Sequence, residues 1–515
     1  MRTFKHHFIA ASILASVASG YSQAEEQKET SASKELTERI QIIGHGNKLR
    51  TEAGSATLIG EVELEKFKFD DISRVLYSVP GVNIREEDGF GLRPNIGFRG
   101  ATPERSKKIT VMEDGILIGP APYSAPAAYY FPMMSKMTAL EVFKGPAAIK
   151  YGPNTVAGAL NMTTRAVPDV SEGVLDFATG NDGFFKAKGH YGNTVDNFGF
   201  LIEGVHIQSD GFKELDGGGD TGFEKQDLML KLNYDLSNSE YRQIVELKVS
   251  YADEVSDETY LGLTDADFAS NPNRRYVASQ NDKMDWEHQQ IQFTHFIGND
   301  DFDLTTRVYR NDFERSWFKI NGFKKAGAFT PTLQNVLAKP DEYSEFYQVL
   351  TGERDSLAEN EKIVLGDNAR EYYSQGIQTE LHIPLQLFGF THKINAGLRF
   401  HQDQIKRRHT EDVFLMKNAA LVSDGSPTLA TTTNMEETDA ISVFIQDTIA
   451  IDKLDLTFGL RGEFLDAYYQ NQAPGKSGDW LKKDSSILLP SISGFYTVNE
   501  DFGLLFGIHE GFVPT

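Results

Sequence analysis

The chain has 515 residues, of which 40% are hydrophobic and 24% are charged, a composition that excludes a disordered chain. Its 51 basic and 74 acidic side chains give a formal net charge of −23, which argues against a nucleic-acid partner because the phosphates would be repelled. The sequence contains no cysteine, so disulfides and thiolate metal sites are excluded.

The first 24 residues have the features of a secretory signal peptide. Arg2 and Lys5 supply a positive start, residues 8–17 form a short apolar run, and residues 22–24 read as a small-x-small cleavage site. We therefore expect the mature chain to begin at Glu25. No later segment has the roughly 18 consecutive apolar residues of a transmembrane helix, whereas the alternating strands of a β-barrel would escape such a search.

Two short segments precede the first folded region. Residues 25–37 are polar and lack periodicity, which predicts a flexible tether. Residues 38–44 (ERIQIIG) alternate and are rich in β-branched side chains, so they could add as a strand to the sheet edge of another protein. From there to residue 168 the sequence is compact and mixed, with several Gly-Pro and Pro-Gly turn signals.

From residue 173 onward, strand-length segments alternate apolar and polar side chains. The clearest is 453–467, where Leu456, Phe458 and Leu460 share one parity and Arg461 and Glu463 share the other. In a strand these two sets face opposite sides of the sheet. A soluble antiparallel sheet with one wet face would show the same alternation, so any single segment leaves both architectures open.

The connections between these segments favour a membrane barrel. About thirteen strands are expected, and short joints alternate with long ones, so that the long loops gather at one end of an up-and-down sheet. The short joint at 180–183 is the exception. The long connections are expected near 209–222, 254–286, 314–371, 406–436 and 469–485. An odd strand count does not close an antiparallel barrel, and the sequence stops just after a strand, so we expect a C-terminally truncated chain.

Several blocks resemble the plug domain of TonB-dependent outer-membrane receptors. They are DISRVL at 71–76, VPGV at 79–82, NIGFRG at 95–100, ITVMEDG at 109–115 and the long block at 141–164. The later segments TYLGLT at 259–264 and HEGFVP at 509–514 are similar to the ferric dicitrate-type branch of that family. The resemblance covers residues 38–515.

The resemblance implies an all-β membrane barrel, 22-stranded in the family, with an N-terminal α+β plug inside it. The implied domains are a signal peptide at 1–24, a tether and TonB box at 25–44, the plug at 45–170 and the incomplete barrel at 171–515. The implied function is TonB-dependent uptake of a ferric chelate, ferric citrate or another siderophore, across the bacterial outer membrane. No enzyme activity, bound metal or cofactor is expected, since iron would travel as the substrate chelate.

The resemblance also implies partners and site residues. The partners would be TonB with its ExbB–ExbD motor, the chelate, and outer-membrane lipid and lipopolysaccharide around a monomer. The TonB-binding strand would be Glu38, Arg39, Ile40, Gln41, Ile42, Ile43 and Gly44. A lock between plug and barrel would join Arg99 and Lys144 to Glu463 and Glu510. Lys144 departs from the family's usual arginine, and Glu510 has the parity of lipid-facing residues, so either a bulge shifts it or it lies beyond the apolar band.

Substrate contacts are expected at the plug apices, 88–94 and 119–131, and at arginines in or beside the long loops. The predicted set is Arg93, Tyr123, Tyr129, Tyr130, Arg274, Arg275, Arg315, Arg407 and Arg408. Such cations would attract an anionic chelate to an acidic protein. The same architecture importing a corrinoid, nickel chelate or oligosaccharide stays open, as does a secreted β-rich enzyme or adhesin, although no G-x-S-x-G or H-E-x-x-H motif supports an enzyme.

Overall fold

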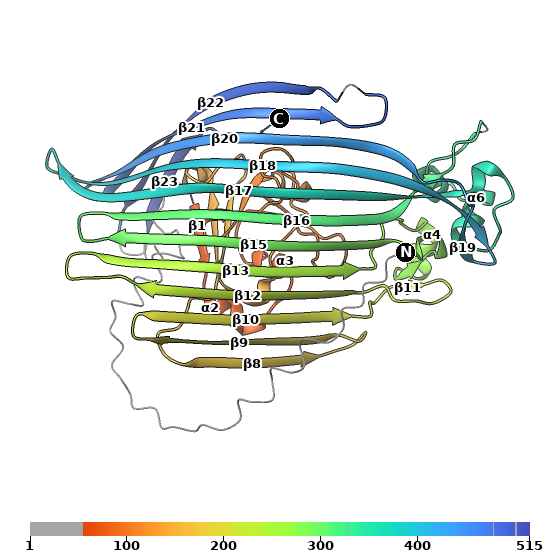
Figure 1. The fold of residues 1–515 in the computed structure, drawn as a ribbon, viewed down its shortest axis with the longest axis horizontal. Helices are drawn as coiled ribbons and strands as arrows, with labels where there is room; N and C mark the ends of the chain where they lie inside the picture. Colours follow the sequence, from red (N-terminus) through yellow and green to blue (C-terminus); the bar gives the residue numbers. More distant parts are fainter. Residues whose placement is uncertain (1–54, 328, 477, 500–501, 515) are drawn as a thin grey trace.

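The computed structural model describes residues 55–327, 329–476, 478–499 and 502–514. The expected signal peptide, tether and TonB-binding strand lie outside these residues. A small mixed unit comes first in the chain, and a large antiparallel sheet curves around it (Figure 1). Among the described residues, no helix is both long and apolar enough to cross a bilayer.

The small unit is the plug, built on a five-stranded sheet with the order β1-β6-β7-β4-β5. Its helix α3 (Ile72–Leu76) begins where the side chain of Asp71 accepts a hydrogen bond from the Ser73 amide at 2.7 Å, an N-cap that satisfies an otherwise free donor. A separate hairpin joins β2 to β3. The remaining elements are β1 (Ser55–Ile59), α2 (Glu61–Phe67), β2 (Val82–Arg85), β3 (Asn95–Phe98), η2 (Glu104–Ser106), β4 (Ile109–Glu113), β5 (Ile116–Leu117), η3 (Met134–Lys136), β6 (Met137–Lys144), η4 (Gly145–Ala148) and β7 (Gly158–Thr164).

The large sheet has thirteen strands in unbroken antiparallel order, and β19 (Ala420–Ser423) pairs with β18 outside that order. This arrangement confirms the predicted fold class. The strands are β8 (Glu172–Thr179), β9 (Phe185–Val195), β10 (Phe198–Ser209), β12 (Phe223–Asp235), β13 (Arg242–Ser256), β15 (Lys283–Gly298), β16 (Asp303–Phe323), β17 (Ile363–Leu387), β18 (Phe390–Lys417), β20 (Leu429–Ile451), β21 (Leu454–Asn471), β22 (Trp480–Thr497) and β23 (Gly503–His509).

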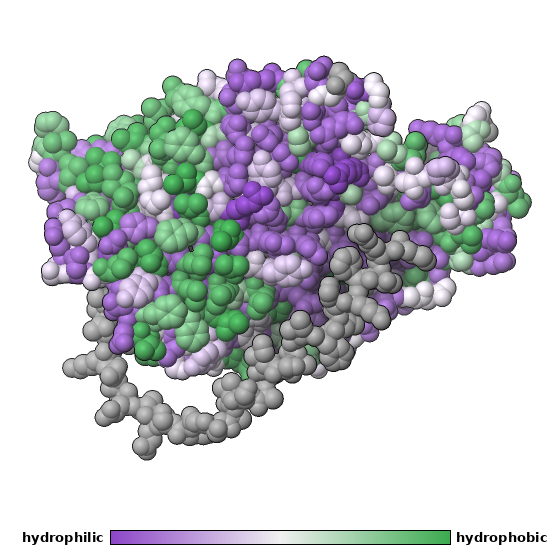
Figure 2. Space-filling view, in the orientation of Figure 1, coloured by the Kyte–Doolittle hydropathy of each residue, from purple (hydrophilic) through white to green (hydrophobic). Residues whose placement is uncertain are grey.

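The two faces of this sheet differ as the alternation predicts. On β21, Phe458, Leu460 and Phe464 are each about half exposed on the outer face, whereas Arg461 and Glu463 are buried against the plug. Figure 2 shows apolar residues gathered over the part of the outer face near the short turns, with polar residues toward the long loops. An apolar outer band and a polar interior suit a barrel in lipid.

The long loops carry folded structure at one end of the sheet (Figure 1). Val336, Val349 and Leu350 pack with Ile320 and Met416 of the neighbouring strands in one buried cluster. These loop elements are β11 (Glu214–Leu215), α4 (Asp265–Ser270), β14 (Arg274–Arg275), η5 (Val277–Ser279), α5 (Leu333–Ala338), α6 (Ser344–Thr351) and η6 (Glu359–Glu361).

Several strands extend farther than the sequence suggested. Residues 314–323 continue β16, 363–371 begin β17, and 406–417 together with 429–436 belong to β18 and β20. The backbone there keeps its antiparallel pairing although the outward side chains have become polar. The expectation that these segments are loops is therefore wrong, because the loss of apolar alternation marks the end of the apolar band and not the end of the strand.

Candidate functional site

Three arginines lie side by side on the inner face of the sheet, near the long loops. Arg315 on β16 is directly opposite Arg370 on β17, and Arg370 is directly opposite Arg407 on β18. We call these three residues the arginine row. Like charges directly opposite each other in a sheet are destabilising unless something compensates them.

Compensation within the arginine row is incomplete. Arg407 forms an ion pair with Glu436 on the next strand. Arg370 donates to His409 Nε2 at 3.1 Å, and Arg315 donates to the Asn368 carbonyl at 3.4 Å. Among the described residues, neither Arg315 nor Arg370 has a carboxylate within ion-pair distance, although Arg315 is only 2% exposed. The two guanidinium groups of Arg315 and Arg370, without a carboxylate partner in the part of the chain that the structure describes, are a candidate anion-binding site on the inner face of the barrel wall formed by the large sheet.

Three aromatic side chains, which we call the aromatic cluster, cover these cations. They are Tyr129 from the plug apex, Tyr260 from a long loop and Trp317 from β16. The Arg315 guanidinium carbon lies 4.1 Å from the centre of the Tyr129 ring, and that of Arg370 lies 5.6 Å from it. Tyr260 is 44% exposed, so the cluster reaches solvent on the side of the long loops. Ring faces stabilise neighbouring cations.

Two further cations complete the site. The guanidinium carbon of Arg105, from the plug, lies 5.4, 5.5 and 5.7 Å from the ring centres of Tyr129, Tyr260 and Trp317. Lys319 Nζ lies 5.7 Å from the Tyr260 ring centre. Plug, wall and loop therefore each contribute to one basic and aromatic surface, which has the chemistry to hold an anion with several acidic groups.

The structure brings together three of the nine predicted substrate residues. Tyr129, Arg315 and Arg407 meet at this site, whereas Arg408 faces the opposite side of the sheet. Arg408 pairs there with Glu371 at 2.7 Å, and its side chain is 54% exposed. Neighbours in a strand point to opposite faces, so Arg407 and Arg408 do not share a site. The structure therefore places Arg408 away from this site.

The two predicted loop arginines hold the loops together. Arg274 forms ion pairs with Asp216 and Asp267, at 3.0 and 2.7 Å. Arg275 is 3% exposed and donates to the hydroxyl and carbonyl oxygens of Ser279, at 2.8 and 2.6 Å. Their hydrogen-bonding capacity is used within the loop, so the structure does not place them as substrate contacts.

The remaining three predicted residues lie between the plug and the wall. Arg93 forms a buried ion pair with Glu254 at 2.6 Å. Tyr123 donates its hydroxyl to Glu463 at 2.9 Å. Tyr130 stacks on His288 with ring centres 3.7 Å apart. Each is nearly fully buried, so the structure places these three residues in the contact between plug and barrel and not at an open surface.

The four residues of the expected lock do not form ion pairs with one another in the described part of the chain. Lys144 donates to the Pro80 carbonyl at 2.7 Å, and Arg99 is exposed beside Gly145. Glu510 lies just past the end of β23 and is also exposed, which resolves the parity question without a bulge. Glu463 is fully buried, but its cation is Arg461, two residues away on the same strand, at 2.7 Å.

Barrel arginines instead donate hydrogen bonds to backbone carbonyls of the plug. Arg461 donates to the Lys150 carbonyl at 2.8 Å, and Arg399 donates to the carbonyls of Tyr151 and Gly152 at 3.2 and 2.5 Å. A Cβ at Gly152 would lie 2.9 Å from Arg461 Nε, so glycine is needed for this close approach.

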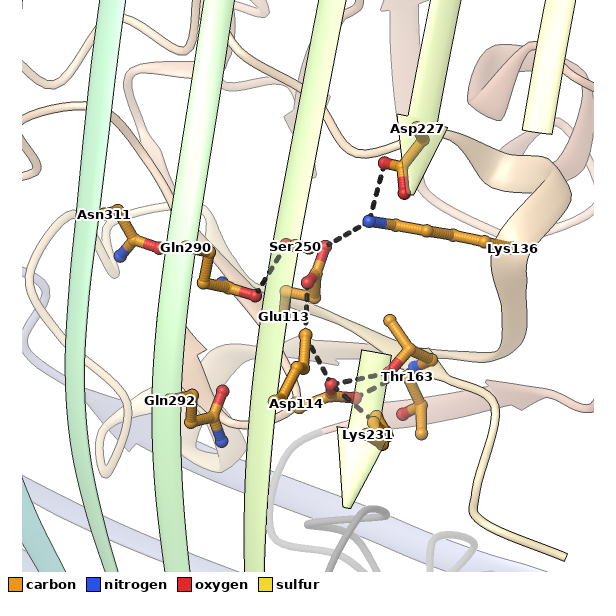
Figure 3. A network of polar contacts seen from close by, with 12 residues as sticks. Glu113, Asp114, Lys136, Thr163, Asp227, Lys231, Ser250, Gln290, Gln292 and Asn311 are labelled. Carbon is orange, nitrogen blue, oxygen red and sulfur yellow. Dashed lines mark hydrogen bonds and ion pairs between the residues drawn. The ribbon is translucent and has the colours of Figure 1, made fainter. Parts of the chain in front are cut away.

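A second anchor is a buried network of carboxylates and lysines that joins the plug to β12 and β13 (Figure 3). Plug residues Glu113 and Asp114 contact Lys248 of β13, which lies 2.7 Å from Asp114. Lys136 of the plug lies 2.8 Å from Asp227 of β12 and 3.7 Å from Glu113. The last member, Lys231 of β12, lies 3.7 Å from Asp114. Lys231 also lies 3.9 Å from Glu246 of β13, so each charged member has a partner of opposite sign, as buried charges require.

The network favours the charged forms of its plug residues Asp114 and Lys136. Burial alone would raise the pKa of Asp114, but Lys231 and Lys248 more than offset this and hold it well below its ordinary value. Burial likewise opposes the charge on Lys136, yet Asp227 and Glu113 raise its pKa well above the ordinary value. Separating plug from wall would thus leave buried charges without partners.

Sequence reasoning missed Arg105, Tyr260, Trp317, Lys319 and Arg370. Trp317 and Lys319 share the parity of Arg315, so strand periodicity could have found them once β16 was extended. Arg105 has no local sequence signal, because its position depends on the fold of the plug. Within the described residues, no group of three or more His, Asp or Glu side chains is arranged to hold a metal ion.

Family models match most of the chain. The TonB-dependent Receptor Plug Domain matches residues 48–159, and the TonB dependent receptor-like β-barrel matches residues 169–515. The curated vitamin B12 transporters BtuB of Vibrio vulnificus and Photobacterium profundum are 26% and 25% identical over 177 and 180 residues. These alignments cover 34% of this chain and 28% and 29% of the relatives.

Solved structures share the fold. Unliganded ferric citrate transporter FecA superposes with a TM-score of 0.71 at 21% identity, covering 91% of this chain and 65% of that one. The siderophore receptor PiuA from Acinetobacter baumannii gives a TM-score of 0.66 at 14% identity, covering 89% and 65%. The chain thus spans just under two thirds of these structures and less than a third of the curated relatives' length. Plug and barrel both match, and the chain belongs to the TonB-dependent receptor family, a family of outer-membrane receptors and transporters and not of enzymes.

Proposed function

We propose that this receptor imports an anionic ferric chelate, with ferric citrate as the leading candidate, across the bacterial outer membrane. The observation that carries the proposal is the pairing of Arg315 with Arg370 beneath Tyr129, with no carboxylate partner among the described residues. A bound polycarboxylate would remove the repulsion between the two guanidinium groups and gain charge-assisted hydrogen bonds to both.

The parts of the site have separate roles in this proposal. Arg315 and Arg370 bind the carboxylates of the chelate, and the aromatic cluster packs against its organic surface. Arg105 and Tyr129 belong to the plug, so the bound chelate touches the domain that must rearrange for passage. The likeness in fold to FecA, which is named a ferric citrate transporter, supports this choice of cargo.

Energy would come from outside the chain. The strand 38–44 would pair with TonB, powered by the ExbB–ExbD motor, and the pull would disturb the plug. The receptor would act as a monomer whose outer apolar band contacts lipid and lipopolysaccharide. No covalent step is part of this cycle.

A corrinoid is the second candidate cargo, because curated relatives are named vitamin B12 transporters. The row of arginines favours a polyanion over a corrinoid, since a cargo without several acidic groups would leave the repulsion between Arg315 and Arg370 in place.

The test is uptake of radiolabelled ferric citrate by cells with an intact outer membrane that express the full-length receptor. Wild type is compared with Ile42→Pro, which removes a strand-pairing donor, and with Arg315→Gln/Arg370→Gln. Arg408→Gln, which removes one positive charge from the outer face, is the control for loss of charge away from the arginine row. Loss of uptake in the first two variants but not in the control supports both cargo and coupling. If wild-type cells take up cyanocobalamin but no ferric citrate, the cargo is a corrinoid and not the chelate.

A further inference from the structure

The plug turn η2 holds Arg105 in a conformation that its own sequence does not favour. Arg105 and Ser106 both have φ near +51°, in the left-handed region that costs non-glycine residues energy. The Arg105 amide donates to Asn95 Oδ1 at 2.8 Å, and its carbonyl accepts from the Ala128 amide at 2.9 Å. The strained turn thereby connects the start of β3 to the apex loop 119–131.

The side chain of Arg105 already holds a carboxylate. Its two terminal nitrogens lie 2.7 and 2.9 Å from the two oxygens of Glu87, a bidentate ion pair. The same guanidinium faces all three rings of the aromatic cluster. Of the four cations beside these rings, Arg105 is the one that has an ion pair with a described carboxylate, whereas Arg315, Arg370 and Lys319 have none.

Glu87 occupies the edge of the guanidinium that the two terminal nitrogens of Arg105 form. This edge accepts one carboxylate in bidentate fashion, so a ligand carboxylate that binds there competes with Glu87. From these contacts, we infer that Glu87 occupies the position that a ligand carboxylate would take at Arg105. We infer further that Glu87 is displaced when the chelate binds. The inference rests on the proposed function, because it presumes an anionic cargo.

Displacement also accounts for selectivity. A ligand with one carboxylate would only exchange one ion pair at Arg105 for another and gain little. A ligand with several would exchange that pair and also reach Arg315 and Arg370, which have no such competitor. Glu87 thus disfavours singly charged compounds at a site that would otherwise attract any anion.

The test measures binding of ferric dicitrate to the purified full-length receptor at low salt. Glu87→Gln keeps the shape and an acceptor oxygen but loses the charge, and it should tighten binding by about tenfold, equivalent to about 1.4 kcal/mol. Glu87→Ala should also tighten binding. If the glutamine variant does not fold, the affinity of the alanine variant tests the inference. The gain should shrink at high salt because screening weakens the competition.

Two controls isolate the contact. Glu86→Gln changes net charge equally at the neighbouring residue, whose carboxylate accepts from the Tyr77 hydroxyl instead, and it should leave affinity unchanged. In an Arg105→Gln background, Glu87→Gln should give no gain. Binding by wild type with unchanged or weaker binding by both Glu87 variants would overturn the inference and leave the proposed function standing. No binding by wild type or variants would overturn both.

Discussion

Arg315 and Arg370 face each other across two adjacent strands, and in the described part of the chain no carboxylate separates or neutralises them. Removing one of these charges should therefore have opposite effects on ligand binding and on stability. Arg315→Gln should weaken ferric citrate binding by roughly tenfold or more, the value of a charge-assisted contact. It should also raise the unfolding temperature of the ligand-free receptor, because the repulsion is relieved. Calorimetry with and without the chelate measures both effects. A variant that lowers stability and leaves affinity intact would mean that the arginine row is structural.

The buried network at Glu113 and Asp114 predicts a large penalty for losing one lysine. Lys248→Met should destabilise the attachment of the plug by about 3 kcal/mol or more, because two buried carboxylates lose their nearest cation. Hydrogen exchange of β4 and β7 amides in the full-length receptor measures the change. Lys339→Met removes an exposed loop lysine paired with Glu342 and should have no measurable effect on those amides. Equal exchange in the two variants would contradict the anchoring role of the network.

A carboxyl group beside Arg93 predicts pH dependence near neutrality. Burial raises the pKa of Glu258 to about 7, against the opposing effect of Arg93, while Asp88 and Glu254 add to the rise. The folded protein then holds a proton that the unfolded chain releases near its ordinary pKa of 4.5. Stability should therefore fall as pH rises from about 4.5 to 7, because unfolding releases about one proton over this interval. In Glu258→Gln the slope of stability against pH over this interval should be shallower. An unchanged slope would show that other groups titrate there.

The contacts of Asp267 predict how fast the amides of the long loops exchange. Its carboxylate accepts from the hydroxyls of Tyr276 and Tyr347 and pairs with Arg274, which joins segments of three loops. Asp267→Asn should speed amide exchange in α4 and α6 by about tenfold, since a charged hub of hydrogen bonds is lost. Asp265→Asn, on the exposed side of the same helix, is the matched control. Slower or unchanged exchange in the Asp267 variant would mean that the apolar cluster alone fixes these loops.

The fold could be predicted because its signal is local and repeated. Each strand shows a period of two, and Phe458 against Arg461 is enough to assign both faces of β21. The site could be predicted only in part because it depends on register between strands. Arg370 was assigned to a loop, so nothing indicated that it faces Arg315 across the sheet. Treating 406–436 as a loop also hid the fact that Arg407 and Arg408 point in opposite directions. Charge partners were harder still, since the cation of Glu463 proved to be its near neighbour Arg461 and not a plug residue.

Arg399 and Arg461 hold the plug by main-chain oxygens at residues 150–152, and every residue type carries the same carbonyl. Substitutions at Lys150 or Tyr151 would leave these bonds in place, and only a bulkier residue at 152 would block them. This part of the interface therefore places little constraint on which side chains the plug carries. A plug of the same backbone course that keeps Glu113, Asp114 and Lys136 for the buried network could therefore carry other side chains at 150 and 151 and still be held by this barrel, which defines what a chimeric receptor must retain.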